Sequence, residues 1–483
     1  MSAAAFLFQE VPVSTILILL GFLVLLNFAR TLFTIALRAG LVGEIAIGLV
    51  FGTPLLDLLG VGLQETFAAL GYLGLLSIVF EGGLGTNLKQ AKRNIGLSLL
   101  VGTTGICLPI VTCILFFHFG FSSTFLQGFT AGAALSATSL GTTFSILEDA
   151  GLTKTRVGTV LISAAMFDDV VGLVISQVVH GLAQDAHHGA NAIGWQIGRP
   201  ILASAGLLLV TYVLVKVGLL ILPALLARMS LSSRGHQYWS VVALFILLVA
   251  FIAISSYSGT SHLLGTFLAG ISLRAIESGL TQKTGAEPHC APSHIFERHI
   301  RPIQEYVFAP LFFATIGFAI PIRTMFDGET LWMGLVLTVL MTVAKWLSGI
   351  SVLVWNLRPK ENLMDEAALE IVVGPNSLGE FNSTRELVPM TVHENANLVS
   401  PEFKPDTRNQ KDVKLLPLMI LGFSMVSRGE IGLLIANIAY PSVLDERLFK
   451  VSIWAVLLCT IIGPFAVGHM VKSGVVERLG KWG

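Results

Sequence analysis

Two adjacent acidic residues, Asp168 and Asp169, interrupt an apolar stretch at 161–175 that holds no basic residue. Because neighbouring carboxylates repel each other, one tends to keep a proton near neutral pH unless a cation lies beside them. Sodium and potassium are hard ions that prefer oxygen ligands, which carboxylates supply. The pair therefore predicts a site whose charge is balanced either by a proton or by a transported metal cation.

Three other apolar stretches carry polar groups near their middle. A hydroxyl- and glycine-rich patch includes Thr138 and Ser139, and such a patch can offer freed carbonyls and hydroxyls to an ion. Lys345 is a candidate partner for one of the two acids. Arg428 and Glu430 lie two residues apart in a second polar break, and we predict that they form a charge pair in this broken helix. Each patch alone is also compatible with ordinary helix packing, since small and hydroxylated residues mediate contacts between membrane helices.

The composition assigns these stretches to a membrane. The chain of 483 residues is 54% hydrophobic and only 12% charged, whereas a soluble domain carries roughly a quarter charged residues. The formal net charge of zero gives no reason to expect a nucleic-acid partner. We predict an all-α polytopic membrane protein in contact with the lipid bilayer, with about 13 transmembrane helices of about 17 to 25 residues each. The predicted spans are 11–29, 33–52, 64–84, 95–118, 124–147, 157–180, 199–226, 237–256, 261–274, 303–321, 331–356, 415–440 and 449–473.

Basic residues predict the orientation of these spans, because lysine and arginine concentrate in cytosolic connections. They fall almost entirely in every second connection, and the alternate connections hold only Arg199, Arg323, Arg447 and Lys450. We therefore expect an N-terminus outside or in a lumen and a cytosolic C-terminus. The chain divides into a first part of the transport domain (1–356), a largely disordered cytosolic loop (357–414), the last two helices (415–475) and a short cytosolic tail (476–483).

The two polar breaks occupy corresponding positions in two units of three spans, the fourth to sixth and the eleventh to thirteenth. The second unit is offset from the first by seven spans, and an odd offset reverses the direction in the membrane. The sequence thus predicts inverted repeats with two broken helices that face each other beside Asp168 and Asp169, an architecture of many secondary transporters.

These residues resemble the monovalent cation/proton antiporter superfamily, in the branch with paired aspartates. The resemblance rests on short segments in a specific order: 43–48 with Gly52, 80–84, 137–139, 167–172, 264–270, 312–317 and 428–432. It implies that Asp169 is the principal carrier of ion and proton, with Asp168 as its companion. Lys345 would pair with Asp168 when no sodium is bound. It also implies a six-helix core that moves against a dimerising panel, and hence a homodimer. Some relatives have an acid where this chain has Thr138 and Ser139, so no further carboxylate ligand is expected there.

The predicted function is secondary active, electrogenic exchange of Na⁺ or K⁺ for H⁺, without enzymatic activity and without a cofactor. A passive monovalent cation channel and a sodium-coupled solute symporter remain alternatives. An intramembrane aspartyl protease also uses two buried acids, but its acids come from separate helices. Adjacent residues on one helix point about 100° apart, which disfavours that enzyme.

Overall fold

The computed structural model describes residue 10 and residues 12–37, 39–86, 95–139, 156–184, 190–228, 233–284, 292–351 and 418–472. In these residues every regular element is a helix, and there is no β-strand. Within them, nine helices are long and apolar enough to cross a membrane. The protein is thus an all-α, multi-pass integral membrane protein. The predicted loop 357–414 and tail 476–483 lie outside the described residues.

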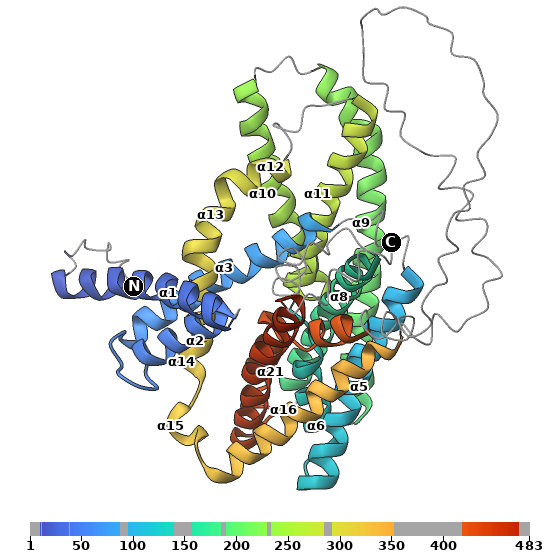
Figure 1. The fold of residues 1–483 in the computed structure, drawn as a ribbon. Helices are drawn as coiled ribbons and strands as arrows, with labels where there is room; N and C mark the ends of the chain where they lie inside the picture. Colours follow the sequence, from blue (N-terminus) through green and yellow to red (C-terminus); the bar gives the residue numbers. More distant parts are fainter. Residues whose placement is uncertain are drawn as a thin grey trace, which may run out of the picture.

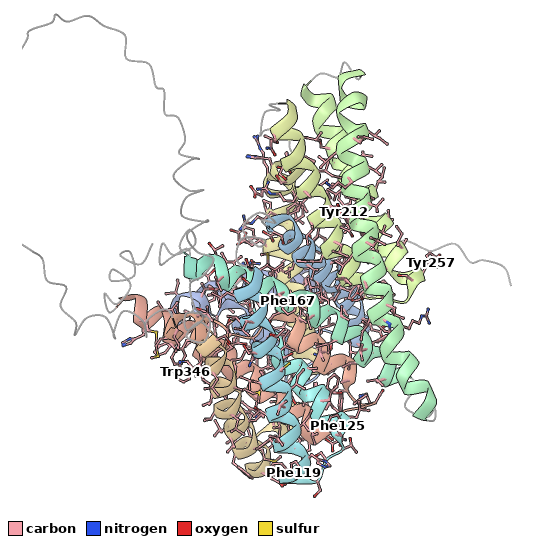
Figure 2. The ribbon with its side chains drawn as sticks, turned by 90° about the vertical axis from the view of Figure 1, so that its right-hand side faces the viewer. Phe119, Phe125, Phe167, Tyr212, Tyr257 and Trp346 are labelled. Atoms are coloured by element: carbon pink, nitrogen blue, oxygen red, sulfur yellow. The ribbon has the colours of Figure 1, made fainter. Side chains whose placement is uncertain are left out.

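Six helical segments pack together as a core bundle, made of the two units expected from the sequence (Figure 1). The first unit is α5 (Ile95–Phe121), α6 (Phe125–Ser136) and α8 (Arg156–Gln184). The second is α16 (Gly328–Ser348), a broken helix formed by 418–424 and α20 (Glu430–Ala439), and α21 (Glu446–Lys472). Contacts of α5 with α16, and of α20 with both α6 and α8, join the two units. Figure 2 shows Phe119 and Phe125 at the end of the bundle where α5 passes into α6.

The remaining helices form a panel beside this bundle. It contains α1 (Val13–Leu37), α2 (Gly40–Phe51), α3 (Val61–Gly85), α9 (Ala190–Arg228), α10 (Ser233–Ser258), α11 (His262–Thr284) and α14 (Ala309–Ala319). Short segments α12 (Pro292–Ile295), α13 (Arg301–Ile303) and α15 (Ile322–Met325) flank α14, with π-helical turns at Phe296–Ile300 and Gln304–Phe308. Glycines allow very close contacts in the panel, since a Cβ at Gly48 would lie 2.2 Å from the Ala314 carbonyl oxygen.

Two segments of the resemblance, 43–48 and 80–84, pack this panel and do not contribute to the paired-aspartate site. Arg30 pairs with the buried Glu44 at 3.7 Å and with Glu305 at 3.1 Å. Arg301 pairs with Glu81 at 3.2 Å. These ion pairs connect α1, α2 and α3 to the π-helical stretch before α14.

The boundary predicted between the first two spans is wrong. The prediction ended the first helix at 29 and began the next at 33, but α1 continues to Leu37 and α2 begins at Gly40. The polar residues Arg30 and Thr31 do not end the helix, because Arg30 pairs with Glu44 and Glu305 and the Thr31 hydroxyl donates to the Asn27 carbonyl of the same helix. The ninth predicted span was also too short, since α11 extends over His262–Thr284.

Candidate functional site

The paired aspartates lie near the middle of the long helix α8. Both side chains are buried: Asp168 is 1% exposed and Asp169 is 8% exposed. Nothing in 161–175 breaks the helical ladder, so α8 remains continuous past the site and holds the two carboxylates on adjacent positions. A rigid continuous helix therefore presents the acids to the two interrupted helices of the bundle.

The two predicted helix breaks meet each other. Helix α6 ends at Ser136, and the backbone is extended at Ala137 (φ −62°, ψ 133°). In the other unit the helix is interrupted at 425–429, and Gly429 is extended where α20 begins. The Ser139 backbone N–H donates a hydrogen bond of 3.0 Å to the Ser427 carbonyl. A Cβ at Gly429 would lie only 2.9 Å from Ser139 Cβ, so glycine permits this contact between the breaks.

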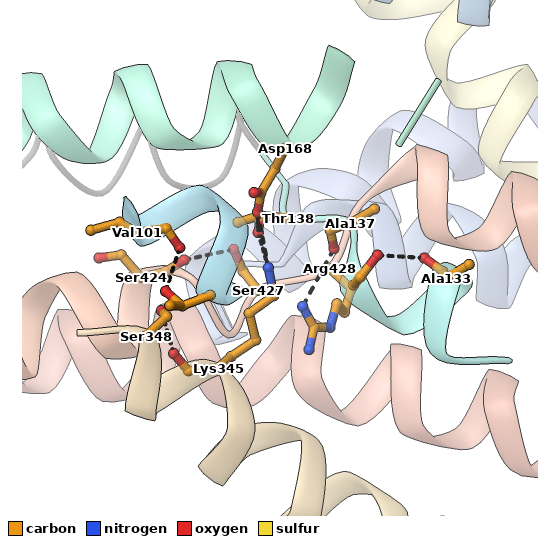
Figure 3. A network of polar contacts seen from close by, with 12 residues as sticks. Val101, Ala133, Ala137, Thr138, Asp168, Lys345, Ser348, Ser424, Ser427 and Arg428 are labelled. Atoms are coloured by element: carbon orange, nitrogen blue, oxygen red, sulfur yellow. Dashed lines mark hydrogen bonds and ion pairs between the residues drawn. The ribbon is translucent and has the colours of Figure 1, made fainter. Parts of the chain in front are cut away.

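A buried triangle of hydrogen bonds joins Asp168, Thr138 and Lys345 (Figure 3). Asp168 Oδ2 accepts a hydrogen bond from the Thr138 hydroxyl at 2.7 Å and an ionic one from Lys345 Nζ at 2.9 Å. Lys345 also donates to Thr138 Oγ1 at 2.8 Å. Both charged side chains are fully buried. The predicted pairing of Lys345 with Asp168 is therefore present in the structure, with Thr138 as the third member.

The second carboxylate oxygen of Asp168, Oδ1, is buried and has no hydrogen-bond partner among the described residues. Leaving such an oxygen unsatisfied is costly, and sites of this kind mark functional groups. Asp169 follows on the same helix and is slightly more accessible. Carboxylate and hydroxyl oxygens at the crossing of two broken helices make a ligand set suited to a hard monovalent cation.

Arg428 stabilises the crossing and does not bind Asp168 directly. It is completely buried, and its Nη1 donates to the Ala137 carbonyl at 3.4 Å, next to the C-terminal end of α6. A positive charge at this position interacts favourably with the partial negative charge at the C-terminal end of the helix. The Arg428 carbonyl accepts from Thr460 Oγ1 of α21 at 3.1 Å. The side chain of Glu430 lies outside what the structure describes, so the predicted Arg428–Glu430 pair stays a prediction.

Two residues that the sequence analysis did not single out face this site from α5. A Cβ at Gly102 would lie 3.4 Å from Asp168 Oδ1, and a Cβ at Gly105 would lie 3.4 Å from Lys345 Nζ. The available signal was a pair of glycines three residues apart on one helical face, inside a predicted span. That signal is common in membrane helices.

Comparisons with known proteins show which sequences and folds this chain is similar to. The transmembrane family of sodium/hydrogen exchangers matches residues 16–381. "Probable Na(+)/H(+) antiporter GerT" of Bacillus cereus is 27% identical over 320 residues, which cover 64% of this chain and 76% of the relative. The Na⁺/H⁺-K⁺ antiporter GerN of the same organism is 26% identical over 316 residues, or 64% of this chain and 72% of the relative. The solved sodium proton antiporter MjNhaP1 of Methanocaldococcus jannaschii has a similar fold, with a TM-score of 0.60, 15% identity and coverage of 97% and 99% of the two chains.

Proposed function

The chain belongs to the sodium/hydrogen exchanger transmembrane family, and on this premise we propose that it is a secondary active antiporter that exchanges Na⁺ or K⁺ for H⁺. The observation that carries the proposal is the Asp168–Lys345 pair at 2.9 Å, buried where the two helix breaks meet and next to Asp169. Relatives named as Na⁺/H⁺ and Na⁺/H⁺-K⁺ antiporters support both the proton and the choice of monovalent cation.

In the proposed cycle, the proton-loaded state has the Lys345 ammonium paired with Asp168, as in this structure, and a proton on Asp169. When the site opens toward low proton concentration, Asp169 releases its proton and the cation enters between the two carboxylates. The cation takes the place of the ammonium on Asp168, because two positive charges compete for the same oxygens. Lys345 then gives up its proton, since an unpaired buried ammonium is strongly disfavoured.

Two protons leave for each cation that binds in this cycle, so one net charge crosses the membrane per turnover. A membrane potential acts on that charge with about 2.3 kcal/mol per 100 mV. We therefore expect electrogenic exchange. The alternation itself would come from movement of the core bundle against the panel, with the aspartates facing one side at a time. The proposal includes a homodimer formed through the panel, and a cytosolic C-terminus supported by the distribution of lysine and arginine.

The test is exchange in proteoliposomes that contain a pH-sensitive dye, with Na⁺, K⁺ and Li⁺ added in turn. We expect a cation-driven pH change whose rate saturates with cation concentration. This rate should also change when a membrane potential is imposed by means other than a K⁺ gradient, because K⁺ is itself a candidate substrate. Steady cation conductance without proton movement would contradict antiport and support a channel. A pH change with no response to potential would contradict the two-proton cycle while leaving antiport intact.

A further inference from the structure

Helix α5 presents backbone rather than side chains to the buried ion pair. Gly102 and Gly105 are both buried and lie three residues apart, so they share one face of the helix. Gly102 packs against the Phe167 ring, with Asp168 Oδ1 as its next neighbour, and Gly105 faces Lys345 Nζ. Nearby α5 threonines do not serve the site: Thr103 and Thr104 hydroxyls donate to the Leu99 and Leu100 carbonyls of their own helix at 2.7 Å and 2.8 Å.

A second observation shows that this face belongs to the ion site. Asp168 is 1% exposed, and its Oδ1, which has no hydrogen-bond partner among the described residues, lies 3.4 Å from the position of a Cβ at Gly102. The other oxygen, Oδ2, lies 3.8 Å from a Cβ at Gly105. The unsatisfied carboxylate oxygen therefore points toward the glycine face of α5.

The space left by the missing side chain at Gly105 lies beside the Lys345 ammonium, which has to move when a cation binds. A cation that takes Asp168 displaces the Lys345 ammonium, whose other bond in this state is to Thr138. A Cβ at Gly105 would lie 3.4 Å from Nζ, which is ordinary contact distance, and 3.2 Å from the flexible end of Met425. A methyl group would thus fit against Lys345 while the lysine is paired with Asp168. It would, however, fill the space beside Nζ into which the amine could otherwise move.

We propose that Gly105 is a positioning residue that provides the space into which the Lys345 amine withdraws when a cation binds Asp168. This inference rests on the proposed antiport function and adds a determinant of cation affinity to it. A methyl at 105 leaves the empty, ion-paired state intact and disfavours the cation-bound state. Cation affinity falls while the folded, empty protein keeps its stability.

The experiment compares Gly105→Ala with Gly120→Ala, a matched control near the end of the same helix. A Cβ at Gly120 would have nothing within 4 Å. In proteoliposomes we expect Gly105→Ala to raise the KM for each transported cation by about tenfold, a typical size for one overpacking penalty. The factor should be the same for every transported cation. The maximal rate at saturating cation should change far less, and Gly120→Ala should behave as wild type.

Thermal unfolding in detergent gives an independent reading, because a bound cation stabilises the folded state by an amount set by the ratio of its concentration to its Kd. Gly105→Ala should melt like wild type without cation and need about ten times more cation for the same increase in melting temperature. If Gly105→Ala alone fails to fold, Gly105→Ala combined with Met425→Leu removes the nearest contact and takes its place.

An unchanged KM in a folded Gly105→Ala protein would overturn the proposal. Different changes for two cations would also overturn it, since they would mean that the methyl intrudes on the cation and not on the lysine. These failures are distinct from a failure of the antiport proposal, in which wild type and Gly120→Ala would both lack cation-driven proton movement.

Discussion

Replacing Lys345 by glutamine removes the positive partner of Asp168 and keeps a side chain of similar length that can still donate a hydrogen bond. In the structure the two charged groups lie 2.9 Å apart and both are fully buried. The Thr138 hydroxyl continues to donate to the same carboxylate oxygen. The substitution therefore isolates the loss of charge compensation from the loss of packing.

The magnitude follows from the position of the pair. At 2.9 Å and an effective dielectric constant of about 20, the direct attraction is about 6 kcal/mol, and desolvation of both groups offsets most of it. What is measured when one partner is removed is the cost of an uncompensated buried charge, about 3 to 5 kcal/mol. Because the glutamine amide and Thr138 still donate, we expect a loss of free energy of unfolding of about 3 kcal/mol.

This loss should depend on pH in a definite direction. In Lys345→Gln, a proton on Asp168 can replace the missing positive charge, and the folded state gains more from that proton than the unfolded state does. By linkage, the difference in stability between Lys345→Gln and wild type should shrink as the pH falls. The assay is thermal unfolding in detergent, followed by tryptophan fluorescence across a series of pH values.

The decisive comparison is the double variant Asp168→Asn with Lys345→Gln. Both charges are absent in it, and neutral partners of similar shape can hydrogen-bond to each other and to Thr138. It should be more stable than Lys345→Gln alone at neutral pH. A double variant no more stable than the single one, or a single variant that unfolds like wild type, would refute the view that this buried pair is coupled.

Three further outcomes follow from the same contacts. Thr138→Val should lower the free energy of unfolding by about 1.5 to 3 kcal/mol, the size of a hydrogen bond to a charged group, whereas Thr138→Ser should restore it; full stability of the valine variant would contradict the triangle. Gly429→Ala should stop transport, because its Cβ would lie 2.9 Å from Ser139 Cβ and would push the two breaks apart; normal exchange by that variant would show that the contact is dispensable. In wild type, the KM for the cation should rise as pH falls, by up to about tenfold per pH unit for each proton that cation binding releases, and a KM independent of pH between 5 and 9 would exclude direct competition.

The charged part of the site was predictable from the sequence because a charge inside a membrane span carries a large cost and is retained for a reason. That argument selected Asp168, Lys345 and the break that holds Arg428, whereas the break at Thr138 and Ser139 was selected by its hydroxyl and glycine residues. The contact between the two breaks was expected because the second unit is offset from the first by seven spans and is therefore inverted. The hydrogen bond between Ser139 and Ser427 confirms that the breaks meet.

Other features could not be predicted in the same way. Gly102 and Gly105 contribute by lacking a side chain, and a missing group leaves no chemical signature in a sequence. The hydrogen bond from Arg428 to the carbonyl of Ala137, 291 residues earlier in the chain, is another such feature. A contact between a side chain and a distant backbone group depends on how the helices pack, which local patterns do not encode. The first span was predicted to end before Arg30, but the Arg30 side chain pairs with Glu44 and Glu305, so a charged residue is accommodated inside α1.

The central claim is that one carboxylate binds a proton and a cation in alternation, and we assign this role to Asp169. The most direct measurement is cation-driven proton flux by Asp169→Asn in proteoliposomes, with Asp57→Asn, an exposed loop position, as the matched control. Asparagine keeps the size and one carbonyl ligand of aspartate but cannot titrate. We expect Asp57→Asn to exchange like wild type, and a folded, correctly inserted Asp169→Asn protein to show no coupled flux. Substantial cation-coupled proton flux by Asp169→Asn would contradict the account.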